Sequence, residues 1–140
     1  MNPLISVVMP VYNRSNFIAD SIDSIIKQSY PHLELIIVND ASTDNTAKII
    51  EDYAKTDNRI SCIHLSQNGG AFKAGNIGIK QAKGEYYAPH DSDDISHPDR
   101  FKDQLNFLTA NPQLAMIGSN INIINEQGDI VGKRTFPLTY

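Results

Sequence analysis

The sequence predicts an α/β fold in which a mostly parallel β-sheet has helices on both faces, as a three-layer sandwich. The prediction rests on short apolar runs that alternate with helical periodicities, and on the short connections between them. Successive parallel strands need right-handed crossovers, which place helices on the faces of the sheet. The chain has 140 residues, which is the length of one domain.

The first strand-helix unit begins with Ile5 to Met9, an apolar run typical of a buried parallel strand, which we expect to stop at Pro10. Ser15 is suited to cap the helix that follows. The helix shows one apolar stripe with spacing i, i+4, i+7 and i+8, made of Ile18, Ile22, Ile25 and Ile26.

The second unit repeats this pattern. Leu35 to Val38 is a β-branched apolar run, and Asn39 to Ser42 follows as a turn. Ser42 or Thr43 is expected to cap a helix with one apolar side, formed by Ala47, Ile50 and Ala54.

The third and fourth strands are predicted at Ile60 to Leu65 and Tyr86 to Ala88. Between them, the turn Asn68-Gly69-Gly70 leads into a helix with a stripe of small residues. Such a stripe lets a backbone approach a sheet or a ligand closely. Its members are Ala71, Ala74, Gly75, Gly78 and Ala82.

After the acidic segment Asp91 to Asp94, Ser96 or His97 is expected to cap a helix with Pro98 in its first turn. Further on, a longer strand is predicted over Ala115 to Ile124, then a turn at Gly128-Asp129. Ile130-Val131 is expected to form the return strand. The apolar face of the helix consists of Phe101, Leu105 and Leu108.

Composition and charge are those of an ordinary globular protein, with 41% hydrophobic and 20% charged residues. No apolar run is long enough to span a membrane, and the N-terminus lacks the pattern of a signal peptide, so we expect a cytoplasmic protein. Cys62 is the single cysteine and is expected to be a small core residue. The net charge is −4 without a basic cluster, which argues against nucleic acid as a partner.

Polar residues follow each of the predicted parallel strands, so we expect them to gather at one edge of the sheet, where such folds bind ligands. Each could also be an ordinary turn or capping residue. Asp91, Asp93 and Asp94 stand out, because converging carboxylates favour a hard divalent cation whose open positions phosphates usually fill. Alone, such a cluster is also typical of a solvated turn. The other sets are Asn13 and Arg14, Asn39 and Asp40, and Asn68 and Gly69.

Several nucleotide-binding classes are excluded at the level of motif. The chain has no Gly-x-x-x-x-Gly-Lys-Ser/Thr sequence, and Pro10 to Arg14 stands where a dinucleotide fingerprint would follow the first strand. A phosphoreceiver domain would need paired acids there. His90 and His97 flank the acidic segment, but oxygen ligands suit Mg²⁺ and Mn²⁺ better than histidine does.

Six blocks, in order from about residue 5 to 110, closely resemble the family 2 glycosyltransferases, which have a Rossmann-like GT-A fold. They are Val-Val-Met-Pro-Val-Tyr-Asn-Arg (7 to 14), Leu-Ile-Ile-Val-Asn-Asp-Ala-Ser-Thr-Asp-Asn-Thr (35 to 46), Asn-Gly-Gly (68 to 70), Asn-Ile-Gly-Ile (76 to 79), Ala-Lys-Gly-Glu-Tyr (82 to 86) and Asp-Ser-Asp-Asp (91 to 94).

The resemblance implies an inverting transfer of a sugar from a nucleotide-diphosphate donor, most often a UDP-sugar, to a hydroxyl of a glycan or lipid-linked acceptor. It also implies Mn²⁺ or Mg²⁺, with Asp93 toward the metal and Asp91 toward the ribose and metal. Asp40 is implied to hydrogen-bond the base. The implied nucleotide-sugar-binding residues are Pro10, Tyr12, Asn13, Asp40, Asn68, Gly69, Lys73, Asn76, Asp91 and Ser92.

The sequence departs from the family pattern at two points that affect these implied residue roles. Gly75 stands where many members have an arginine, and Lys73 is the nearest substitute, although an exposed helix lysine is the simpler interpretation. Family members use a later carboxylate as general base. Here Glu126 and Asp129 lie in a predicted turn, so the catalytic base is unknown and is expected beyond Tyr140.

Residues 1–140 are therefore expected to form one nucleotide-sugar-binding domain that lacks the acceptor-binding part of a longer enzyme. That enzyme would build a bacterial-type surface glycan, and peripheral association with the inner face of the membrane is compatible with this role. The alternatives are a sugar-nucleotide-binding module without transfer activity and a metal-dependent phosphoryl-transfer domain. The sugar, the linkage and the oligomeric state are not determined by the sequence.

Overall fold

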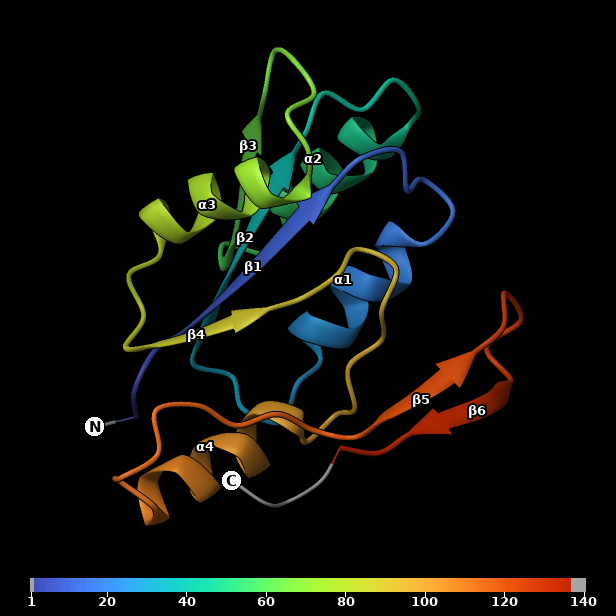
Figure 1. The fold of residues 1–140 in the computed structure, drawn as a ribbon. Coiled ribbons are helices and arrows are strands. Elements are labelled where there is room, and N and C mark those ends of the chain that lie inside the picture. Colours follow the sequence, from blue (N-terminus) through green and yellow to red (C-terminus); the bar gives the residue numbers. More distant parts are fainter. Residues whose placement is uncertain (1, 137–140) are drawn as a thin grey trace. The chain divides into compact units, whose positions relative to one another are not determined.

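Four parallel strands form the predicted sheet, in the order β3-β2-β1-β4 (Figure 1). The computed structural model describes residues 2–136. It divides into two units, one up to Phe101 and one from Lys102 onward. The strands of the sheet are β1 (Ile5–Val11), β2 (Leu33–Asn39), β3 (Ile60–His64) and β4 (Tyr86–Pro89).

Helices cover both faces of this sheet, as predicted. α3 (Ala71–Gln81) packs on β1 and β2 on one face, whereas α2 (Thr46–Thr56) packs on β2 and β3. α1 (Ile18–Ile26) lies beside α2 on the face opposite α3 (Figure 1). The prediction of an α/β fold with three layers is confirmed.

The core lies on the two central strands, which are buried on both faces. This is why β1 and β2 show continuous apolar runs instead of alternation. Full burial of such side chains contributes about 1.5–3 kcal/mol each. Residues without solvent exposure include Val7, Val8, Met9, Leu35, Ile37 and Val38 on the strands, and Ile18, Ile22 and Ile25 on α1.

Gly78 is the point at which α3 approaches the sheet most closely. A Cβ atom at Gly78 would overlap with Val8 Cγ1 and would lie 3.2 Å from Val38 Cγ2. A Cβ atom at Gly75, three residues earlier in the same helix, would meet nothing within 4 Å. The predicted small-residue stripe is therefore a close-packing surface at Ala74 and Gly78, which are buried, but not at Gly75.

Gly78→Ala is expected to destabilise the protein by about 1–3 kcal/mol, because overpacking outweighs the gain in helix propensity. Gly75→Ala is the matched control and is expected to stabilise by about 0.5–1 kcal/mol. Urea unfolding of both variants measures the difference. Equal effects of the two substitutions would contradict the close approach at Gly78.

The strand β1 continues through Pro10 to Val11, contrary to the prediction that it stops at Pro10. On one side, Val11 O accepts a hydrogen bond from Asp40 N at 2.8 Å, and on the other Val8 O accepts one from His90 N at 3.1 Å. Alternate residues of a parallel strand address opposite neighbours, so Pro10 faces β4, where it has no N–H to offer. The pairing of β1 with β4 accordingly ends at Val8 and Pro89.

The side-chain caps predicted for the first two helices are wrong. α1 begins at Ile18 and α2 at Thr46, and neither has a side-chain capping bond. Ser15, Ser42 and Thr43 instead bond between the two loops, as described below. The last helix, α4 (Arg100–Ala110), begins after a turn over Pro98 and Asp99, so Pro98 precedes its first turn.

The second unit contains an antiparallel pair, β5 (Ile121–Ile124) and β6 (Ile130–Arg134). The return strand is confirmed, but the strand predicted over Ala115 to Ile124 is too long, because residues 115–120 do not pair with a neighbour. Asn125 closes the connection by accepting from the N–H groups of Gln127 and Asp129. Among residues 2–136, no helix has both the length and the apolar character needed to cross a bilayer.

Candidate functional site

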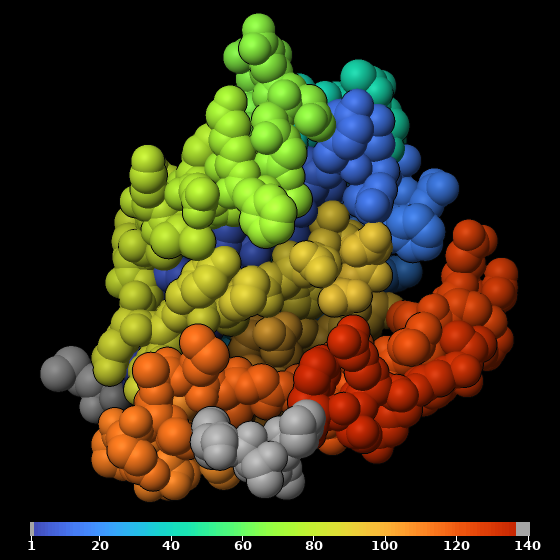
Figure 2. All heavy atoms as spheres, viewed as in Figure 1, coloured from blue at the N-terminus to red at the C-terminus, as the bar shows by residue number. Residues whose placement is uncertain are grey.

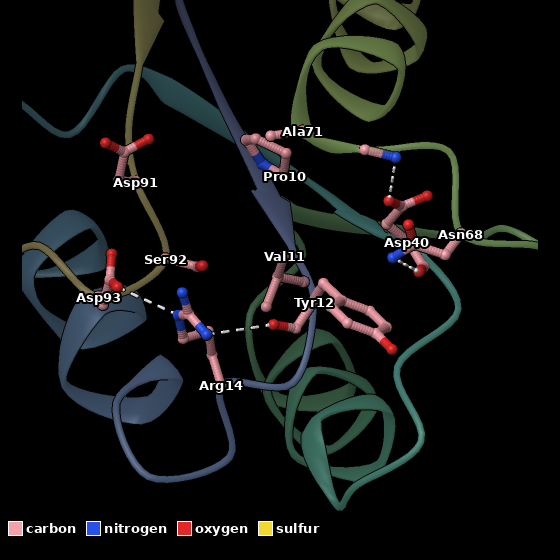
Figure 3. Close-up of a pocket in the computed structure, with 11 residues that line it drawn as sticks. Pro10, Val11, Tyr12, Arg14, Asp40, Asn68, Ala71, Asp91, Ser92 and Asp93 are labelled. Carbon is pink, nitrogen blue, oxygen red and sulfur yellow. Dashed lines mark hydrogen bonds and ion pairs between the residues drawn. The ribbon is translucent and has the colours of Figure 1, made fainter.

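An open cleft of about 450 Å³ lies at the carboxyl ends of the parallel strands, all of it within the first unit. In Figure 2, the loop after β1, the segment before α3 and the acidic segment after β4 meet on one face of this unit. Figure 3 shows the lining residues. They are Pro10, Val11, Tyr12, Arg14, Asp40, Asn68, Gly70, Ala71, Asp91, Ser92 and Asp93.

The cleft lies at the switch in strand order, because β2 and β3 lie on one side of β1 and β4 lies on the other. Open α/β sheets bind ligands at such a switch. At Pro10, where β4 no longer pairs with β1, the two strands separate and leave an opening between them. Sequence, topology and cleft therefore agree on the location of the site.

The loops after β1 and β2 are fastened to each other through Asn13. Its N–H donates to Ser42 Oγ at 3.0 Å, and its Oδ1 accepts from Thr43 N at 2.8 Å. Asn13 has φ 51°, and Ala41 on the facing loop has φ 60°. Asparagine tolerates this left-handed conformation, whereas alanine adopts it at a cost of about 1–2 kcal/mol.

Asp44 adds a second fastening between the same loops. It accepts from Ser15 N at 3.1 Å and from Thr46 N at 2.9 Å. Burial opposes ionisation of this carboxyl group, but the hydrogen bonds from Thr46 and Ser15 outweigh it and lower the pKa of Asp44 to about 2. The carboxylate therefore holds the first turn of α2 to the entry of α1.

Asp40 fixes the segment before α3, at one end of the cleft (Figure 3). Its side-chain oxygens accept from Gly69 N at 2.9 Å and from Gly70 N at 2.7 Å, and Asn68 Nδ2 donates to its main-chain oxygen at 3.2 Å. Asp40 is only 2% exposed. It is thus a buried organiser of this segment that also lines the cleft.

The acidic segment forms the opposite end of the cleft. Asp91 and Asp93 are exposed, while Ser92 between them is buried. Partial burial, followed by the charges of Asp91 and Asp93, raises the pKa of Asp94. The expected convergence of three carboxylates is not found: within residues 2–136 no group of three His, Cys, Asp or Glu side chains is arranged to hold a metal.

Arg14 lines the cleft, as expected of a polar residue at this edge, although the family resemblance did not imply it as a binding residue. Its Nε donates to Asp93 Oδ2 at 3.1 Å, and its NH1 donates to the main-chain oxygens of Tyr12 and Asn13 (Figure 3). The two ionic side chains are 43% and 45% exposed, so solvent screens this pair and it contributes little to stability. The only sequence signal was the position of Arg14 directly after the first strand.

A polar stripe that runs along α1 to Gln28, just beyond the end of the helix, anchors the acidic segment, and this stripe was missed. Ser21, Ser24 and Gln28 have the helical spacing i, i+3 and i+7 beside the isoleucine stripe. Ser21 Oγ donates to Asp91 O at 3.1 Å, and Ser24 Oγ accepts from Ser96 N at 3.0 Å. Gln28 Nε2 donates to His97 O at 2.7 Å.

His90 lies buried under the acidic segment, with 4% exposure. Its Nδ1 is 2.8 Å from Asp91 O and its Nε2 is 3.0 Å from Ser96 Oγ. Burial and then the charge of Arg100 lower the pKa of His90 to about 4, so the ring is neutral near pH 7. His97, by contrast, is exposed, and its Nδ1 accepts from Asp99 N.

Some of the predicted binding residues do not line the cleft. Asn13 serves the contact between loops, and Asn76 is exposed on α3. Lys73 is exposed and its side chain lies against Gly69. Gly69 contributes its N–H to Asp40, while the neighbouring Gly70 lines the cleft.

The cleft suits an anion only when a cation accompanies it, because Asp91 and Asp93 lie on its wall and Arg14 is already paired. A magnesium-type ion binds through one or two carboxylates and completes its shell with substrate phosphates. The charges of Asp91 and Asp93 add to the effect of partial burial in raising the pKa of Asp94, and a cation at this segment would offset that repulsion. The donor set is all oxygen, as Mg²⁺ and Mn²⁺ prefer.

The fold and the position of the cleft define the class as a GT-A α/β domain. Residues 6–139 match the family described as Glycosyl transferase family 2, and the chain belongs to that family. The resemblance seen in the sequence is thereby confirmed.

Known proteins of this family include TuaG of Bacillus subtilis, described as a putative teichuronic acid biosynthesis glycosyltransferase. It is 44% identical over 106 residues, which are 76% of this chain and 42% of TuaG. The glycosyltransferase GlyG of Streptococcus pneumoniae is 45% identical over 68% of this chain and 32% of its own length. The chain therefore spans less than half the length of these relatives.

Solved structures agree on the fold. The complex of S. aureus TarS 1-349 with UDP superimposes with a TM-score of 0.72 at 33% identity, over 77% of this chain and 32% of that chain. The mannosyltransferase PcManGT from Pyrobaculum calidifontis, in complex with GDP-Man and Mn²⁺, has a TM-score of 0.74 at 26% identity. That match covers 89% of this chain and 36% of PcManGT.

Proposed function

We propose that this chain carries the donor-binding part of a glycosyltransferase, which transfers a sugar from a nucleotide-diphosphate sugar to a hydroxyl acceptor with inversion. The observation that carries the proposal is the cleft at the strand-order switch. One end is a main-chain segment fixed by buried Asp40, and the other is the acidic segment with Asp91 and Asp93. A nucleotide at the first end would direct its diphosphate toward the second.

The proposed donor is a UDP-sugar. TarS, which was solved with UDP and with UDP-GlcNAc, has 33% and 34% identity in those matches, whereas the neighbour solved with GDP-Man has 26%. Tyr12 is 43% exposed on the cleft wall next to Pro10, and an aromatic ring at this place suits contact with a nucleobase. Asn68 and Asp40 would supply hydrogen bonds at the same end.

In this proposal Asp93 and Asp91 hold a Mn²⁺ or Mg²⁺ ion, with Ser92 in the same wall. When bound, the cation would supply Lewis-acid stabilisation of the leaving diphosphate. Asp93 would have to exchange its ion pair with Arg14 for the cation. Arg14 would then be free to contact a phosphate oxygen.

The acceptor and the general base are not assigned to residues of this chain. Glu126 and Asp129 are exposed around the connection between β5 and β6, a poor environment for a carboxylate that must take up a proton. The name of TuaG, a putative teichuronic acid biosynthesis glycosyltransferase, supports surface-polysaccharide synthesis as the biological role. In this proposal the protein is cytoplasmic and acts on such glycans at the inner face of the membrane.

A second candidate is a sugar-nucleotide-binding module without transfer activity. It is favoured by the lining of the cleft, whose carboxylates within the described residues are Asp40, Asp91 and Asp93. All of these have proposed binding roles, which leaves no base. Membership of a glycosyltransferase family argues against the third alternative, a phosphoryl-transfer domain.

Calorimetric titration of the 140-residue chain with UDP, with and without Mn²⁺, tests the proposal. We expect selective UDP binding that Mn²⁺ strengthens, with ADP and GDP as controls. Preference for GDP would change the donor class, and absence of binding by every nucleotide would contradict a complete donor site. Transfer activity in any longer protein that contains this chain, lost when a later carboxylate is replaced, would separate the enzyme from the binding module.

A further inference from the structure

The main-chain oxygen of Asp91 is the point at which the acidic segment is held. It accepts from His90 Nδ1 at 2.8 Å, from Ser21 Oγ at 3.1 Å and from Asp94 N at 3.2 Å. The last of these bonds closes the turn that carries Ser92 and Asp93. The direction of the two cleft carboxylates therefore depends on how this oxygen is held.

The donors and acceptors around His90 fix which ring nitrogen carries the proton. Arg100 NH1 can only donate, and it lies 2.9 Å from Ser96 Oγ. The Ser96 hydroxyl accepts that bond and gives its own hydrogen to His90 Nε2, at 3.0 Å. Asp91 O can only accept, so Nδ1 at 2.8 Å carries the hydrogen, which leaves Nε2 to accept from the Ser96 hydroxyl.

The arrangement is therefore a one-way series of hydrogen bonds from Arg100 through Ser96 and His90 to the main chain of Asp91. Ser96 is itself held to α1, because its N–H donates to Ser24 Oγ at 3.0 Å. His90 and Ser96 are buried, with 4% and 7% exposure, so water does not replace these bonds readily. An apolar side chain of similar size would fill the space but would not hold Asp91.

We propose that His90 is a positioning residue for the donor site: its Nδ1–H holds the Asp91 main chain and thereby sets Asp91 and Asp93 for the cation. The consequence for nucleotide binding rests on the proposed function, whereas the positioning itself does not. His90 touches neither donor nor cation. Its effect passes through the acidic segment alone.

Three substitutions of His90 distinguish the role of Nδ1 from that of Nε2. His90→Leu removes both hydrogen bonds while keeping an apolar volume. The amide nitrogen of an asparagine lies near the place of Nδ1, so His90→Asn keeps the bond to Asp91. The longer glutamine reaches the place of Nε2, so His90→Gln keeps the bond to Ser96. His97→Leu, an exposed histidine of the same segment, is the control.

The first measurement is amide hydrogen exchange at Asp94 in the ligand-free chain, read by NMR. His90→Leu and His90→Gln are expected to speed exchange by about tenfold, as for the loss of one buried hydrogen bond. His90→Asn and His97→Leu are expected to match the original chain. Unchanged exchange in His90→Leu, or equal effects of Asn and Leu, would overturn the positioning role.

The second measurement is the ratio of the UDP dissociation constants without and with Mn²⁺. His90→Leu is expected to lower this ratio by about tenfold and to leave the metal-free constant unchanged, which a loss of folding would not do. Equal weakening in both conditions would overturn the link to the cation. If the original chain binds no UDP, the proposed function fails, and the exchange rates still decide the positioning.

Should His90→Leu not fold, Ser96→Ala provides the same test from the other side of the ring. It keeps His90 but removes the hydroxyl that holds the ring at Nε2. We expect faster exchange at Asp94. The hydrogen bond from the N–H of residue 96 to Ser24 Oγ should be retained. Exchange identical to that of the original chain would count against the series of bonds.

Discussion

Asp93→Asn is expected to abolish the gain in UDP affinity that Mn²⁺ brings, while UDP binding without metal stays equal or improves slightly. The substitution keeps the shape of the side chain but removes its charge. Two unit charges 4 Å apart near a protein surface interact by about 4 kcal/mol. The loss should therefore reach at least about 100-fold in the metal-dependent part of the affinity, measured by calorimetry.

Asp20→Asn is the matched control, because Asp20 is an exposed acid in the first turn of α1 and does not line the cleft. It changes the net charge by the same amount and should retain the full Mn²⁺ effect. A normal Mn²⁺ effect in Asp93→Asn would exclude Asp93 as a cation ligand. The ion pair with Arg14 would then be its main contact.

Asp40→Ala is expected to destabilise the protein by about 3 kcal/mol and to weaken UDP binding even without metal. The N–H groups of Gly69 and Gly70 would both lose a charged acceptor, and each such bond contributes about 1.5–3 kcal/mol. The segment before α3 would lose its fixed course, and the nucleobase end of the cleft would be lost with it. Urea unfolding and metal-free calorimetry measure the two effects.

Asp40→Asn keeps one carbonyl oxygen as acceptor and should lie between the original chain and Asp40→Ala in both measurements. Stability equal to that of the original chain in Asp40→Ala would contradict the organising role of this carboxylate. Equal effects of Asp40→Ala and Asp93→Asn in the absence of metal would refute the division between a base end and a cation end of the cleft.

Most of the first unit could be predicted, because apolar periodicity reports directly on buried strands and helix faces. The runs at Ile5 to Met9 and at Leu35 to Val38 are buried on both faces, as their composition required. The helix caps could not be predicted. Ser42 has the right chemistry for a cap, but its hydroxyl accepts from Asn13 N in a distant loop, and Ser15 contacts Asp44 through its main-chain N–H.

The candidate site was predictable as a set of loops, but not as a set of contacts. Parallel topology brings the residues after each strand to one edge, which located Asp40, Asn68 and Asp91 correctly in the cleft. The pair of Arg14 and Asp93 joins positions 79 residues apart, and no local pattern encodes such a pair. The polar stripe on α1 was concealed by the stronger isoleucine stripe beside it.

In the second unit, the sequence predicts one strand from Ala115 to Ile124, which is too long. Apolar character allows a strand but does not supply a partner, and only Ile121–Ile124 pairs with β6. Strand length is decided by the neighbour, whereas the preference for a strand is decided by the side chains. The turn was easier to predict, since Gly128 with φ 84° is a local requirement.

Pro10 ends the pairing of β1 with β4 through the main chain alone, because it has no N–H to continue the ladder. The opening between these strands therefore exists before any ligand arrives, and no lining side chain is needed to hold it open. Residues of the wall can then be exchanged to suit another base or sugar without closing the entrance. The main-chain atoms of this segment thus keep the site open, while its side chains can change to alter donor preference.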